Sequence, residues 1–152
     1  MNTEKNVKKF KVGFNNSEKD ARDWNYNSIY LKYKKKINVD ESHIDYRNIL
    51  PPATDQIDQG SCVAHCIACI KEFHEYIEIK CNKDSISTYP KNINGRIMSS
   101  QFIYNMRDIE GDHGMYPKKA LQEIKKHGVC YESEFPYGSD TKKFDIDFIE
   151  VF

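Results

Sequence analysis

The sequence lacks any apolar run approaching the roughly 20 residues that a membrane-spanning helix needs. Its N-terminus, MNTEKNVKKFKVGFNNSEKD, also lacks the apolar core of a signal peptide. Acidic and basic residues balance at 23 each, so no net charge attracts nucleic acid or an anionic membrane. We therefore expect a soluble, intracellular protein that binds neither nucleic acid nor membrane.

Internal repeats and low-complexity tracts are also absent, and the 152 residues are enough for one domain or part of one. Residues 1–48 are polar, rich in lysine and poorly periodic, which predicts an N-terminal extension and linker. Their interleaved aromatic residues are expected to dock on a neighbouring surface without forming a core. The abundance of Lys, Asn and Ile indicates the codon bias of an AT-rich genome. Residues 49–152 carry the periodic patterns of a folded unit.

Three helices are expected in the folded unit. The first starts at Cys62 after a Gly60–Ser61 turn and runs to about Lys80. Its expected apolar face consists of Cys62, Cys66, Cys69, Ile70, Phe73 and Ile77. The second starts at a cap at Ser99 or Ser100 and stops at Gly111, with Phe102, Ile103, Met106 and Ile109 facing inward. The third runs from Pro117 to a stop at Gly128 and buries Ala120, Leu121 and Ile124.

The five cysteines are an odd number, and their spacing is not that of a small disulfide scaffold, so we expect free thiols. Three of them, Cys62, Cys66 and Cys69, lie within eight positions. At the start of a helix, unpaired N–H groups and the helix dipole favour a thiolate over a thiol. Cys62 is therefore a candidate nucleophile, whereas Cys66 and Cys69 are expected to pack as small apolar residues.

A metal site is the alternative interpretation of this cluster. The spacing Cys-x3-Cys-x2-Cys also occurs at iron–sulfur clusters, and His65 adds a fourth possible ligand. However, the ligands of such sites converge from loops or from separate elements, and they do not follow one helix. We therefore favour the nucleophile and expect no cofactor, while a metal or iron–sulfur protein remains an alternative.

The residues around Cys62 resemble the active-site segment of papain-like cysteine peptidases, especially their bacterial and viral branch. LPPATDQIDQGSCVA matches that segment, and SSQFIYNMRDIEG is similar to the second helix of the family. DHGMYPKKALQEIKKHGVCYESEFPY matches its third helix and the Pro-Tyr ending, and GFNNSEKDARDWNYNSIY resembles the stretch that precedes the catalytic domain. The resemblance covers about residues 12 to 138, and the ordered set of motifs is more specific than any one of them.

This resemblance implies an α+β papain-like fold and a peptidase mechanism. Cys62 takes the position of the nucleophile, and Gln56 that of the glutamine that donates to the oxyanion. The positions that match the substrate groove are Gly60, Ser61, Gly114, Met115, Tyr116 and Pro117. Met115 stands where papain has a second glycine, which puts the usual backbone pairing with substrate in question.

The base of the mechanism is the part that the motifs do not supply. The family's histidine and asparagine follow the cysteine by about 130–150 residues, which places them beyond Phe152. Residues 49–152 are therefore expected to be the helical half of the fold, apparently truncated, with the β-rich half largely absent. Residues 1–48 are expected to be propeptide-like. Of the five histidines, His113 is the one candidate base, whereas His65 is expected to pack or to face solvent.

Three hypotheses follow. The first is a cysteine peptidase that acts on peptides or proteins and needs a second chain to supply the missing histidine. The second is a non-catalytic remnant that binds peptides or a partner through its groove. The third is the metal or iron–sulfur protein described above.

Overall fold

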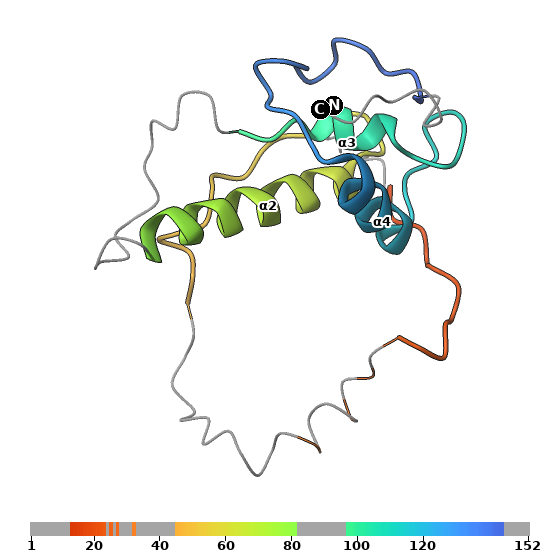
Figure 1. Cartoon of the computed structure of the whole chain (residues 1–152). Helices are drawn as coiled ribbons and strands as arrows, with labels where there is room; N and C mark the ends of the chain where they lie inside the picture. The colour runs from red at the N-terminus through yellow and green to blue at the C-terminus, as the bar shows by residue number, and fades with distance from the viewer. Residues whose placement is uncertain are drawn as a thin grey trace, which may run out of the picture.

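The structure is a computed structural model, which describes residues 13–23, 25, 27, 32, 45–81 and 97–144. Three helices lie in this part of the chain, α2 (Cys62–Cys81), α3 (Ser100–Asn105) and α4 (Pro117–His127). Within the same residues, β pairing consists of two isolated bridges, Phe14 with Met115 and Met98 with Tyr131. Figure 1 shows α2 as the long central element, with α3 and α4 beside its N-terminal half.

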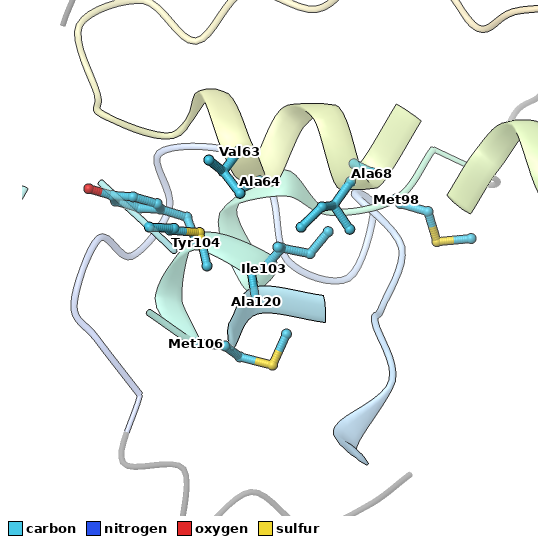
Figure 2. Close-up of a cluster of buried hydrophobic side chains, with 10 residues drawn as sticks. Val63, Ala64, Ala68, Met98, Ile103, Tyr104, Met106 and Ala120 are labelled. Carbon is cyan, nitrogen blue, oxygen red and sulfur yellow. The ribbon is translucent and has the colours of Figure 1, made fainter. Parts of the chain in front are cut away.

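The hydrophobic core lies where these three helices meet (Figure 2). Its buried residues are Val63, Ala64, Ile67, Ala68, Met98, Ile103, Tyr104, Met106, Met115 and Ala120. Three of them are alanines, which let neighbouring helices approach closely. The core therefore joins the start of α2 to both later helices and fixes the position of the segment around Cys62.

The face of α2 that packs on this core differs from the predicted one. The buried positions of α2 are Val63, Ala64, Ile67, Ala68, Glu72 and Tyr76. Cys66 is exposed, Ile70 is 48% exposed and Cys69 is half-buried. The prediction that Cys66 is a packing residue is therefore wrong, as is the inward placement of Ile70. The side of the helix that carries Ala64 and Ala68 lies in the core, so Cys66 and Ile70 face outward, whereas Cys62 packs against the core as a partly buried residue.

Helix α3 begins as predicted but ends early. Ser99 is its N-cap, and the Ser99 side chain accepts a hydrogen bond from the N–H of Phe102. The helix ends at Asn105, whereas the prediction placed its end at Gly111. The buried Arg107 explains the difference, because its guanidinium donates to the carbonyls of Tyr104, Gly111 and Thr141 and folds the chain back.

Helix α4 has the predicted ends. Pro117 opens it, and Gly128, with a φ of 77°, donates its N–H to the carbonyl of Ile124. Ala120 is buried and Ile124 packs against the core, as expected. Leu121 is 54% exposed, so the prediction of its burial is wrong. Ala120 occupies the contact with the core, and the next residue lies about 100° further round the helix.

Candidate active site

Cys62 is the first residue of α2, as the sequence predicts, and its thiol is free and half-buried. The carbonyl of Ser61 accepts the N–H of His65 at 3.0 Å, which starts the helix directly before Cys62. The neighbours Ser61 and Ala64 are fully buried. The Cys62 backbone is therefore held in the core, while part of its side chain stays accessible.

Gln56 lies in a tight turn that leads into this helix. Its side-chain Nε2 donates to the carbonyl of Gln59 at 3.1 Å, and the Gln59 N–H donates back to the Gln56 carbonyl at 3.2 Å. Ile57, between them, has a φ of 54°. A β-branched residue rarely adopts this left-handed conformation, so the surrounding contacts must hold it there. The turn therefore fixes the Gln56 amide at the cost of local strain.

Asp112 holds the other side of this turn, and the sequence motifs do not reveal it. Its Oδ1 accepts the Gly60 N–H at 2.7 Å and the Tyr104 hydroxyl at 2.6 Å. Burial, together with this bond to a carboxylate, raises the pKa of Tyr104, which therefore remains a hydrogen-bond donor. Asp112 thus joins the core residue Tyr104 to the turn that precedes Cys62.

The loop before α4 approaches the same turn. A Cβ atom on Gly60 would lie 3.4 Å from the Gly114 nitrogen, so the two backbones are adjacent. Gly114 has a φ of 83°, a conformation that suits glycine. The structure thus brings Gly60 and Gly114 together with the buried Ser61 and Met115, while Tyr116 and Pro117 follow as half-buried residues at the start of α4.

The N-terminal segment lies in this loop region. The Met115 N–H donates to the Gly13 carbonyl at 2.8 Å, and the Asn15 N–H donates to the Met115 carbonyl at 3.0 Å. Together these bonds form the parallel bridge between Phe14 and Met115. The Asn15 side chain also donates to the His113 carbonyl at 2.9 Å. Both backbone groups of Met115 are therefore paired with residues 13–15.

Contacts further along the chain extend this docking of the N-terminal segment. Lys118 Nζ lies 3.0 Å from an Asp20 carboxylate oxygen and 2.6 Å from one of Asp23. The docking of the extension on a neighbouring surface is thus present for residues 13–23, although Phe14 itself is 54% exposed. The other aromatic residues that are expected to take part in this docking lie outside the described residues; they are Trp24, Tyr26 and Tyr30.

The described histidines do not supply an evident base. The His113 side chain is exposed, and its ring lies 3.2 Å from where a Cβ on Gly111 would be. His65 is half-buried, with Nδ1 2.7 Å from Thr54 Oγ1 and Nε2 3.5 Å from Ser100 Oγ. Within the described residues, no hydrogen bond joins Cys62 to either imidazole.

The pH dependence of stability provides a test of the His65 environment. Burial lowers the pKa of His65 from 6.5, partly opposed by the charge of Asp55. Below pH 6.5 the His65 imidazole therefore binds a proton more readily in the unfolded chain than in the folded chain. The free energy of unfolding should consequently fall as the pH drops. Urea unfolding over this range should show a weaker fall in His65→Asn than in the wild type.

His74→Asn, which removes an exposed imidazole from the same helix, is the control for this experiment. An unchanged pH dependence in His65→Asn would contradict the prediction.

Two of the other thiols are in environments that suppress the thiolate. Burial, with a contribution from Glu134, raises the pKa of Cys130 to about 11. Burial and Glu72 also raise the pKa of Cys69. Cys66 is exposed, so in the described part of the chain it is the thiol most accessible to reagents besides Cys62.

Among the residues that the structure describes, no three His, Cys, Asp or Glu side chains are grouped as metal ligands. The described helices also include none with both the length and the apolarity to cross a membrane.

The fold is similar to that of papain-like cysteine proteases, and the residues that the structure describes correspond to a mainly helical part of it. One solved structure that the chain matches is the crystal structure of xylellain, a cysteine protease from Xylella fastidiosa, with 25% sequence identity and a TM-score of 0.54. The alignment covers 96% of this chain and 50% of the xylellain chain, so this chain spans half the length of that protein. No protein-family model matches the sequence. No curated protein matches it either.

Proposed function

We propose that this chain is the nucleophile-bearing helical part of a papain-like cysteine peptidase. The observation that carries the proposal is the position of Cys62 at the first residue of α2, in a fold similar to a cysteine protease. The Cys62 thiolate attacks the scissile carbonyl, as an Sγ–C bond forms and the carbonyl electrons move onto oxygen. The Gln56 side chain and the Cys62 N–H stabilise this oxyanion.

The substrate groove in this proposal is lined by Gly60, Ser61, Gly114, Met115, Tyr116 and Pro117. The adjacent backbones of Gly60 and Gly114 support it. The pairing of residues 13–15 with Met115 supports it further, because a peptide already lies there in extended form. Met115 uses its backbone in this pairing, so its side chain does not prevent a peptide from binding. Residues 1–48 are then a propeptide-like extension that occupies the groove through residues 13–15.

The proton acceptor in this proposal is a histidine from outside the described residues. The placement of two described histidines supports this part of the proposal. His113 rests against Gly111, and His65 pairs with Thr54, so each imidazole is placed away from a hydrogen bond with Cys62.

A non-catalytic peptide-binding protein is the second candidate. The pairing of Met115 with residues 13–15 favours it, because this pairing needs neither the thiol nor a base. Loss of peptide binding on Cys62→Ala would count against this candidate, whereas unchanged peptide binding without any hydrolysis would favour it.

Selective alkylation of Cys62 tests the peptidase proposal. A Cys66→Ser background removes the exposed competing thiol among those that the structure describes. In this background, iodoacetamide near neutral pH should modify Cys62 at least about tenfold faster than Cys69 or Cys130, because those two thiols remain protonated. Peptide mapping by mass spectrometry measures the three rates. Urea-unfolded protein, in which the thiols become equivalent, is the control. Equal rates in the folded protein, or peptide hydrolysis that survives Cys62→Ala, would rule out the mechanism.

A further inference from the structure

Tyr137 connects the two ends of the turn that precedes the nucleophile. Its hydroxyl donates to the Gln56 carbonyl at 2.9 Å and lies 2.7 Å from the Ser61 hydroxyl. A phenol has one hydrogen, which the bond to Gln56 uses, so Ser61 must donate to the Tyr137 oxygen. A single hydroxyl thus binds Gln56 and the residue directly before Cys62, although it lies 81 positions away from Gln56 in the chain.

The backbone around Tyr137 is itself held rigidly. The Tyr137 N–H donates to Glu132 Oε1 at 2.6 Å, and the Gly138 N–H donates to Gln101 Oε1 at 3.0 Å. Gln101 lies on α3 and is fully buried. The Tyr137 ring also contacts the His65 ring edge-on, with 4.9 Å between their centroids. The hydroxyl is therefore fixed relative to both α2 and α3.

The two groups that Tyr137 ties together are those that carry the oxyanion donors. Gln56 holds the donating amide, and Ser61 is bonded directly to Cys62, whose N–H is the other donor. The distance between the two donors depends on the shape of the turn from Gln56 to Ser61. We propose that Tyr137 is a positioning residue that sets this distance and so determines how well the site stabilises an oxyanion. This inference rests on the proposed peptidase function.

Burial raises the pKa of Tyr137, so its hydroxyl remains protonated and keeps donating to Gln56 over the working range of pH. Asp112 fixes Gly60 from the opposite side. This second attachment means that loss of the Tyr137 hydroxyl should loosen the turn without releasing it.

A comparison of two reagents separates oxyanion stabilisation from thiol reactivity. A dipeptide aldehyde forms a hemithioacetal with Cys62. An Sγ–C bond forms, the carbonyl π bond opens onto oxygen, and the thiol proton ends on that oxygen through solvent. Its stability depends on the oxyanion donors. Iodoacetamide instead forms an Sγ–C bond as iodide leaves, and no oxyanion develops.

Tyr137→Phe should therefore weaken aldehyde binding about tenfold, a fraction of the effect of deleting a whole oxyanion donor. Its iodoacetamide rate at Cys62 should stay within about twofold of the wild type, since the helix start is unchanged. NMR of an aldehyde with an isotope-labelled carbonyl carbon reports the hemithioacetal directly and gives its dissociation constant. Tyr131→Phe, which removes an exposed phenol from the same segment, is the matched control and should change neither quantity.

Equal aldehyde affinities of Tyr137→Phe and the wild type would overturn the positioning role, even with Cys62 confirmed as the nucleophile. A wild-type chain that forms no hemithioacetal and shows no selective alkylation would overturn the peptidase proposal as well. If Tyr137→Phe does not fold, Ser61→Ala provides the test, because it removes one arm of the bridge and keeps the phenol. It should weaken aldehyde binding by a smaller factor, and an unchanged affinity would again contradict the inference.

Discussion

Gly13→Val is expected to displace the N-terminal segment and to open the proposed substrate groove beside Cys62. A Cβ atom on Gly13 would lie 1.7 Å from the Gly60 carbonyl oxygen, and because this clash is with backbone, no side-chain movement relieves it. Three hydrogen bonds hold the segment on the His113–Met115 loop, and together they are worth about 3 kcal/mol. Release of the segment should therefore raise the access of a reagent to the proposed groove by up to about a hundredfold.

The measurement is the rate at which a peptide epoxide modifies Cys62, since this reagent must occupy the groove. The rate should rise by about tenfold or more, while the rate with the small reagent iodoacetamide should change much less. Asn16→Val, an exposed change in the same segment, is the control. An epoxide rate in Gly13→Val equal to that of the wild type would show that the segment does not compete with groove ligands.

Arg107→Met should cause the largest loss of stability among the substitutions considered. Arg107 is 4% exposed. Its guanidinium donates to three backbone carbonyls and lies 4.5 Å from the centre of the Tyr104 ring. Methionine fills much of the volume but leaves the carbonyls of Gly111 and Thr141 without this donor. The free energy of unfolding should fall by about 3 kcal/mol or more, because bonds from a charged donor are strong and buried acceptors are costly to leave unpaired.

Urea unfolding followed by circular dichroism measures this loss. Arg47→Met, which removes an exposed arginine from a local pair with Asp45, is the control and should leave the unfolding midpoint nearly unchanged. A similar, small effect of both substitutions would show that Arg107 does not hold the chain after α3 in place.

The sequence predicts a longer α3 than the structure has, because the apolar pattern continues past the buried Arg107 that ends the helix. The apolar spacing through Ile109 predicted a helix up to Gly111, and the pattern carries no sign that Arg107 is buried. The partner Thr141 lies 34 residues away from Arg107, so a local pattern cannot reveal the bond that ends the helix. Asp112 and Tyr137 were missed for the same reason, because their partners near Cys62 are distant in the sequence.

The sequence by itself determined where the three helices begin, where α4 ends, and the position of the candidate nucleophile. These features depend on backbone conformation and hydrogen bonds that residues close in the sequence decide. They are the cap at Ser99, the limits of α4 at Pro117 and Gly128, and the position of Cys62 at the start of α2. Only the tertiary structure decided which side of α2 is buried. From Cys62 to Ile70 the one polar residue is His65, so hydrophobicity marks no outer face.

The packing of the side chains, rather than their hydrophobicity, distinguishes the buried side of α2 from the exposed side. Ala64 and Ala68 of α2 lie in the same buried core as Ala120 of α4, and Cys66 and Ile70 face outward on another side of α2. The same contacts fix the turn before Cys62 between Asp112 and Tyr137 and place Gly13 against Gly60. Local sequence therefore specified where the thiol lies on its helix, and long-range packing specified what surrounds it.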